Sequence, residues 1–205
     1  MVITEKFAWA HLPKAAGDAT RSMFASVPGL VTFQAPSESN EKHNGYWVHE
    51  REIGDRLRVM NIRRLPSWIL SAAHHKAASG LHPDYTPLPM PSVDEMTEDT
   101  DPDDLLRWMT GPHLPVQRWL RAENLGEDVE ALLRDVGVDP DVARRAIESV
   151  PWVGNDYEHD VSRVFSSEQI ARMYELNPGW AAAERAAYGN VGPTPGHGAT
   201  SAEAE

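Results

Sequence analysis

The stretch from Phe7 to Val27 restricts the possible folds of this chain more than any other part of it. It opens with the short apolar run Phe7–Ala10, which suits a buried strand, and continues into apolar residues at helical spacing. The apolar face of this predicted helix contains Ala19, Met23 and Val27. We therefore expect a strand, a short loop, and a helix that begins near Gly17 or Asp18 and packs on a sheet.

The loop between this strand and helix, Lys14-Ala15-Ala16-Gly17, has almost no side-chain bulk beyond the lysine. Backbone N–H groups at a helix start attract anions, small side chains let an anion approach them, and Lys14 adds a positive charge. The Walker pattern G-x-x-x-x-G-K-[ST] does not fit, because its lysine comes at the end of the loop. The segment predicts a phosphate site of another kind; the alternative is that Asp18 caps an ordinary helix.

The composition limits the partners of the chain. Its 205 residues include no cysteine, which excludes disulfides and thiol chemistry, and the net charge of −12 argues against binding to nucleic acid. No run approaches the roughly 20 apolar residues of a membrane span, and the first residues lack the pattern of a signal peptide. We expect a cytoplasmic protein of one domain without a transmembrane segment; the sequence leaves its oligomeric state open.

Alternation of strands and helices predicts the fold class. Residues 30–33 and Leu57–Ile62 are typical of strands, and the second of them is followed by the basic turn Arg63-Arg64 and a helix over about 67–79. A strand, a short basic turn and a helix thus occur twice, which favours an α/β fold of three layers, P-loop-like, with a mostly parallel sheet. Further helices are expected in the second half, over about 102–109, 126–137, 140–150, 166–176 and 180–188.

Two segments are predicted to lie outside this regular structure. Residues 82–104 are rich in proline and then in acidic residues, which is typical of a long surface loop that acts as a linker or as a lid. Residues 190–205 are rich in Gly, Pro, Ser and Ala, and we expect this tail not to fold. The predicted domain therefore spans residues 1–189.

The loop after the first strand resembles the 5'-phosphosulfate-binding loop of sulfotransferases that use 3'-phosphoadenosine 5'-phosphosulfate, commonly His-x-Pro-Lys-Thr-Gly/Ala-Gly-Thr-Ser. The residues that match are His11, Pro13, Lys14 and Gly17. Ala15 replaces the usual threonine, and Asp18-Ala19 stands where Thr-Ser is common, which leaves Thr20 as the hydroxyl nearest to the loop.

The turn after Leu57–Ile62 resembles the 3'-phosphate-binding element of the same family, an arginine followed by a serine eight residues later. Arg63 and Ser71 have this separation, whereas the position of the proline favours Arg64 as the matching arginine. We prefer Arg63 with Ser71 and keep Arg64 as the second choice. Residues 117–128, with their Arg-x-Glu-Asn-Leu piece, and residues 165–189 resemble the late segments of the family, so the resemblance covers most of residues 5–189.

The resemblance implies a sulfotransferase that moves a sulfuryl group from 3'-phosphoadenosine 5'-phosphosulfate to a hydroxyl or amine of a small molecule or carbohydrate, without a metal. The product would be adenosine 3',5'-bisphosphate. Lys14 would stabilise the leaving 5'-phosphate, and Arg63 and Ser71 would select the 3'-phosphate. The residues that would surround the 5'-phosphate are Ala15, Ala16, Gly17, Asp18, Ala19 and Thr20.

A hydroxyl acceptor needs a general base, and His43 is the preferred candidate because imidazole titrates in the useful range. His49 and Glu50 are its rivals, and the pair His74-His75 is a candidate contact for the acceptor or nucleotide. Two other readings stay open: a non-catalytic relative that binds nucleotide, and a P-loop kinase-like phosphotransferase.

Overall fold

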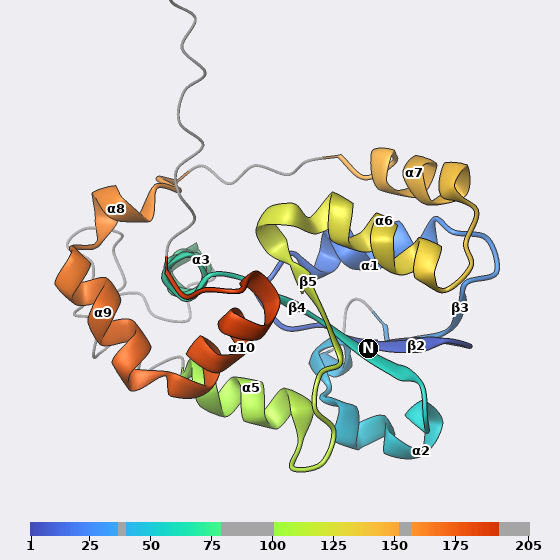
Figure 1. Cartoon of the computed structure of the whole chain (residues 1–205), viewed down its shortest axis with the longest axis horizontal. Helices are drawn as coiled ribbons and strands as arrows, with labels where there is room; N and C mark the ends of the chain where they lie inside the picture. The colour runs from blue at the N-terminus through green and yellow to red at the C-terminus, as the bar shows by residue number, and fades with distance from the viewer. Residues whose placement is uncertain (37–39, 79–100, 152–156, 193–205) are drawn as a thin grey trace, which may run out of the picture.

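The computed structural model describes residues 1–36, 40–78, 101–151 and 157–192 (Figure 1). The predicted tail lies almost entirely outside these residues, and so does the predicted acidic loop as far as residue 100. Residues 102–104, which the predicted loop and the predicted helix over about 102–109 share, belong to the helix, and Asp101 is its N-cap. Asp103 in this helix is buried, and its carboxylate accepts from the backbone N–H groups of Gly179 and Trp180 at 2.7 and 2.6 Å.

A single five-stranded sheet forms the centre of the described structure. Its strands are β1 (Val2–Thr4), β2 (Phe7–Ala10), β3 (Val31–Gln34), β4 (Leu57–Ile62) and β5 (Arg118–Arg121), in the order β3-β1-β2-β4-β5. β2, β4 and β5 run parallel, while β1 is antiparallel to both of its neighbours. The sheet is therefore mixed rather than mostly parallel, and β1 and β5 are strands that were not predicted.

The alternation of side chains along the strands divides the core in two. Phe7 and Trp9 of β2 pack on one face with α1 (Gly17–Ala25), α6 (Leu125–Asp135) and α7 (Pro140–Glu148). Ala8 and Ala10 pack on the other face, against α3 (Leu65–Ala78), α5 (Pro102–Thr110) and α10 (Pro178–Tyr188). Helices thus cover both faces, which gives the three layers that the sequence predicts (Figure 1).

The remaining elements are short except for one helix. They are η1 (Asn40–His43), η2 (Tyr46–His49), α2 (Glu50–Ile53), η3 (Ala122–Asn124), α8 (Val161–Val164) and α9 (Ser167–Leu176). The longer predicted helices are confirmed with shifts of one or two residues at their ends. In α3, the helix begins at Leu65 because Pro66 lies in the first turn, where its missing N–H removes no helical hydrogen bond.

None of the helices in the described ranges has the length and apolar character that crossing a membrane requires.

Candidate functional site: two strand-to-helix turns

The turn between β2 and α1 leaves the start of the helix without a side-chain cap from the described residues. Lys14 and Ala16 both have left-handed backbone angles, with φ of 61° and 62°. Ala16 is the N-cap of α1, and no side chain within the described part of the chain caps the helix there. The first amides of α1 are consequently left without the usual capping partner, which is the arrangement that anion sites at helix starts use.

Gly17 is required by the close approach of the turn to His11. A Cβ atom at position 17 would lie 1.9 Å from Cδ2 of His11, and the imidazole is buried with 3% of its surface exposed. The ring of His11 also packs on Trp9 at 5.2 Å between centroids. In this chain, the glycine that matches the family pattern is therefore explained by packing against His11.

Thr20 is not placed as a phosphate ligand. Its hydroxyl donates to the carbonyl of Ala16 at 3.0 Å and accepts from Nδ2 of Asn61 at 2.8 Å. The other side of the Asn61 amide accepts from Nε1 of Trp9 at 2.6 Å. These buried bonds use the hydroxyl proton of Thr20, so the residue braces the turn from within the core.

The turn between β4 and α3 meets the first turn directly. Nη1 of Arg63 donates to the carbonyl of Lys14 at 3.3 Å, and Nε1 of Trp68 donates to the carbonyl of Pro13 at 2.7 Å. Because β2 and β4 are adjacent parallel strands, their carboxyl ends bring these two turns to one edge of the sheet. Neither Lys14 nor Arg63 belongs to an ion pair between described residues.

The charge on Lys14 is affected by this neighbourhood. Burial lowers the pKa of the Lys14 ammonium, and the nearby guanidinium of Arg63 lowers it further. A chain with a net charge of −12 thus places two cations side by side at the start of α1. Bringing like charges together costs free energy, so the two cations favour the binding of negatively charged groups at this edge of the sheet.

Ser71 lies on the side of α3 that faces the Lys14 turn. Trp68, Ser71 and His75 follow one another at helical spacing and therefore share a face. Trp68 contacts Pro13, and the charge of Lys14 is the largest cause that lowers the pKa of His75. Ser71, between these two, is buried with 3% of its surface exposed.

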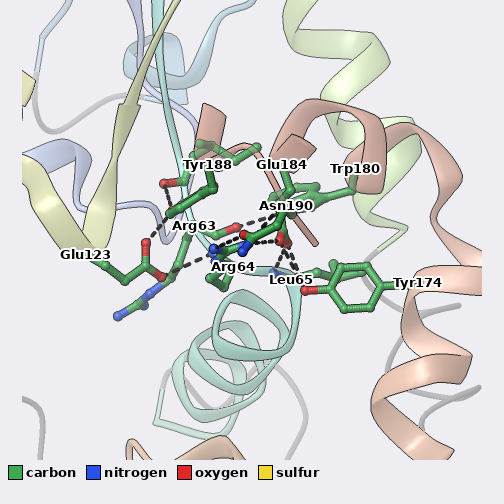
Figure 2. A network of polar contacts seen from close by, with 10 residues as sticks. Arg63, Arg64, Leu65, Glu123, Tyr174, Trp180, Glu184, Tyr188 and Asn190 are labelled. Carbon is green, nitrogen blue, oxygen red and sulfur yellow. Dashed lines mark hydrogen bonds and ion pairs between the residues drawn. The ribbon is translucent and has the colours of Figure 1, made fainter. Parts of the chain in front are cut away.

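Arg64 faces away from this cluster. Its guanidinium donates to Oε2 of Glu184 at 3.1 Å and to Oδ1 of Asn190 at 2.7 Å, and it lies 3.9 Å over the ring of Tyr188 (Figure 2). Only 5% of its surface is exposed. The structure thus separates the two arginines of the turn: Arg63 lies beside Lys14, and Arg64 lies in a buried network with the C-terminal helix.

His43 lies next to the first turn. Its Nδ1 donates to the carbonyl of His11 at 3.1 Å, and the two rings are 4.6 Å apart. A carbonyl only accepts, so this bond places the proton of neutral His43 on Nδ1 and leaves the lone pair on Nε2. Burial lowers the pKa of His43, which keeps the ring neutral near pH 7.

His11, which was matched to the family pattern but was not assigned a role, is a second neutral imidazole in the cluster. Burial, followed by the charge of His43, lowers its pKa from 6.5 to about 3. Its Nδ1 is buried without a hydrogen-bond partner among the described residues.

Asp18 reaches the cluster from the first turn of α1. Its carboxylate lies 3.7 Å from Nζ of Lys42, the residue before His43, and 80% of the side chain is exposed. Its negative charge opposes part of the lowering of the pKa values of Lys14 and His43. Lys42 was not predicted as a site residue, and its proximity to Asp18 has no simple sequence signal.

His49 and Glu50, the rivals of His43, belong to a different region. The ring of His49 packs 5.3 Å from the ring of Phe33 on the edge strand β3, and Glu50 begins α2 with its side chain exposed. His74 stacks on Tyr157 at 4.2 Å between ring centroids. Of the predicted histidines, His43 contacts the first turn directly, and the pKa of His75 is lowered by the charge of Lys14.

A third arginine at the same edge of the sheet is fully paired. Arg121 ends β5, and Nε and Nη2 of its guanidinium donate to the two oxygens of Asp128 at 2.9 and 2.6 Å. Both residues line a pocket of about 310 Å³ between β5, α6 and α10. The second arginine of this pocket, Arg118, pairs with Asp135 at 3.1 Å, so the pocket has no excess positive charge for an anion.

Within the described ranges, no group of three or more His, Asp or Glu side chains is arranged to hold a metal ion. None of the protein-family models, curated proteins and solved structures with which the chain was compared matches it.

Proposed function

We propose that the chain is a P-loop-like sulfotransferase that transfers a sulfuryl group from 3'-phosphoadenosine 5'-phosphosulfate to an acceptor hydroxyl or amine. The observation that carries the proposal is the contact between Arg63 and Lys14, at 3.3 Å from Nη1 to the carbonyl oxygen. Two turns 49 residues apart in sequence thereby present a cation each at one edge of the sheet. A nucleotide with phosphates at both its 5' and 3' positions needs two such sites.

The first turn has the properties that a 5'-phosphate requires. The start of α1 lacks a side-chain cap from the described residues, and the side chains before it are those of Ala15 and Ala16. Backbone N–H groups can therefore bind the oxygens of a phosphate, with Lys14 supplying a full positive charge. Thr20 takes no part in this binding, because its hydroxyl proton is bonded to Ala16.

The second turn would bind the 3'-phosphate. The guanidinium of Arg63 offers paired N–H donors that match the oxygens of a phosphate, and Ser71 adds a hydroxyl from the facing side of α3. The buried guanidinium of Arg64 is bonded to Glu184 and Asn190, so we assign the phosphate to Arg63.

The donor supplies an activated sulfuryl group, and the residues of the chain would supply position and charge. When the bond from sulfur to the bridging oxygen of the 5'-phosphate breaks, negative charge develops on that oxygen. Lys14 would stabilise this charge, which is greater in the transition state than in the ground state. The acceptor oxygen forms the new bond to sulfur, and its proton passes to Nε2 of His43, which the bond from Nδ1 to His11 leaves free.

Binding and turnover test this function separately. Adenosine 3',5'-bisphosphate should raise the melting temperature, since a ligand that binds only the folded state stabilises it, while ATP with Mg²⁺ should have a smaller effect. Lys14→Ala should abolish transfer of labelled sulfate from the donor to an acceptor, with Lys6→Ala as the matched control. Lys6 is exposed in the turn before β2, at the opposite end of that strand.

Absence of stabilisation by either nucleotide would contradict a nucleotide site of any kind. Stabilisation by adenosine 3',5'-bisphosphate without transfer from the donor would favour a relative that binds nucleotide and does no chemistry. Two observations favour this second candidate: Asp18 stands where the family has a hydroxyl residue, and the hydroxyl of Thr20 is already bonded. Stronger stabilisation by ATP with Mg²⁺ would favour the kinase-like reading.

A further inference from the structure

The turn that carries Arg63 is held by side chains of later elements, one from η3 and three from α10. Tyr188 donates its hydroxyl to the carbonyl of Ile62 at 3.2 Å, and Nε1 of Trp180 donates to the carbonyl of Arg63 at 3.0 Å. The next two residues of the turn are held through their N–H groups. Glu123 accepts from the N–H of Arg64 at 3.2 Å, and Glu184 accepts from the N–H of Leu65 at 2.5 Å.

Four consecutive residues of the turn are thus each bonded to a side chain of α10 or of η3 (Figure 2). These side chains are themselves linked: the single hydroxyl proton of Tyr188 is shared between the carbonyl of Ile62 and the carboxylate of Glu123, and the hydroxyl of Tyr174 donates to Glu184 at 3.1 Å. We refer to Glu123, Trp180, Glu184 and Tyr188 as the C-terminal clamp.

The clamp also explains why two adjacent arginines have different surroundings. Arg64 is anchored by Glu184 and by the ring of Tyr188, both of them on α10. Arg63 and Arg64 follow directly after β4, and the anchoring of the Arg64 side chain at α10 leaves the side chain of Arg63 to reach the other turn. At that turn, Arg63 contacts Lys14.

We propose that the C-terminal clamp positions Arg63 and thereby sets the preference of the site for ligands with a 3'-phosphate. The inference rests on the proposed function, because it assigns Arg63 to that phosphate. Trp180 and Tyr188 are positioning residues: their side chains bond to the backbone beside Arg63 and act on the ligand through its guanidinium.

The test compares two nucleotides that differ in one phosphate. The dissociation constants of adenosine 3',5'-bisphosphate and of AMP, measured by calorimetry on the full chain, give a ratio that reports the contribution of the 3'-phosphate. Arg63→Met should reduce this ratio toward one. Trp180→Phe and Tyr188→Phe each remove one bond to the turn, and each should reduce the ratio by roughly tenfold, the equivalent of one misplaced charge-assisted hydrogen bond.

Two control variants remove bonds of the same kind elsewhere. Tyr46→Phe removes a hydroxyl bond to the carbonyl of Val59, which also lies in β4, and Trp47→Phe removes an indole bond to the carbonyl of Trp108. Both should leave the ratio unchanged even where they lower the melting temperature. A clamp with a purely structural role would affect stability in Trp180→Phe and Tyr188→Phe and leave the ratio as it is in the parent chain.

The outcomes separate this inference from the proposed function. If the parent chain binds neither nucleotide, the proposed function fails and the inference falls with it. If Arg63→Met lowers the ratio and both clamp variants keep it, the proposed function stands and the positioning role is wrong. A ratio that Arg63→Met does not change would remove Arg63 from the 3'-phosphate site and overturn the inference as well.

Discussion

The β2–α1 turn and the β4–α3 turn lie at the same edge of the sheet, but they are held in place differently. The first is braced by residues of the N-terminal third: Thr20 and Asn61 in the core, and Trp68 at the carbonyl of Pro13. The second is braced by Glu123, 59 residues further along the chain, and by side chains of α10, which lie more than a hundred residues further along. The first half of the candidate site is held by residues of its own third of the chain, while the second half is held mainly by the C-terminal helix.

The two turns also differ in the charge of their supports. The first rests on neutral groups, including a buried imidazole with a pKa of about 3. The second rests on a buried ion pair, in which Glu184 is fully buried and 3.1 Å from Arg64. Burial raises the pKa of Glu184, and the bonds from Leu65 and Arg64 oppose that shift. Buried pairs of this kind tolerate the loss of one partner poorly.

Glu184→Ala should therefore have the largest effect on stability. It leaves the guanidinium of Arg64 buried without its carboxylate, which typically costs about 3–5 kcal/mol in the free energy of unfolding. Chemical denaturation of the variant and of Glu130→Ala would measure the difference. Glu130 pairs with Arg134 at 3.8 Å on the surface of α6, where an ion pair contributes less than about 1 kcal/mol. Equal losses in the two variants would contradict the special role of the second turn.

Gly17→Ala should have the next largest effect, and it breaks the first turn. The new methyl group would overlap the ring of His11, so the turn or the imidazole must move, at a cost of about 1–3 kcal/mol in unfolding free energy. Gly126→Ala in α6 is the control, because its methyl group would meet Ile147 at an ordinary 3.4 Å. Alanine is the better helix former, so this control should unfold at the same or higher denaturant concentration. An unchanged free energy of unfolding in Gly17→Ala would mean that the turn can accommodate the methyl group.

The first turn could be predicted from sequence because its determinants are local. The apolar run Phe7–Ala10, the small residues after Lys14 and the helical spacing from Gly17 lie within about twenty positions, and β2 and α1 occupy the expected residues. β4 likewise coincides with the predicted strand Leu57–Ile62. In these segments the local propensity and the tertiary structure agree.

What could not be predicted depends on contacts over long distances. β1 has three residues and β5 has four, too few for a clear alternation, and each is fixed by pairing with a neighbouring strand. The separation of Arg63 from Arg64 is decided by Glu184 and Asn190, which no spacing within the turn indicates. The pairing of Asp18 with Lys42 likewise depends on how η1 meets the start of α1.

A smaller effect concerns the pH dependence of the first turn. The pKa of His11 is about 3 in the folded chain, where the ring is buried, and 6.5 in the unfolded chain. Between these pH values the unfolded chain binds a proton on His11 and the folded chain does not. The contribution of His11 to the free energy of unfolding is therefore complete above pH 6.5 and declines as pH falls toward 3. At pH 5 the loss is about 2 kcal/mol. Denaturation at pH 7.5 and pH 5 should show this loss in the parent chain and a smaller one in His11→Asn. His113 is exposed, so His113→Asn should lose as much stability between pH 7.5 and pH 5 as the parent chain does. An equal loss in His11→Asn would exclude His11 as the cause.

The smallest expected effect concerns the affinity of the first turn for an anion. Asp18→Asn removes a negative charge beside Lys14 from the first turn of α1, so adenosine 3',5'-bisphosphate should bind more tightly, by roughly threefold to tenfold at low salt. The side chain is 80% exposed, so added salt should screen the charge and reduce the gain. Calorimetric titration at two salt concentrations measures both effects, with Glu127→Gln in the first turn of α6 as the control for a lost helix-dipole interaction. Weaker binding by Asp18→Asn would show instead that the carboxylate assists the site, by holding Lys42 and the adjoining His43 against the turn.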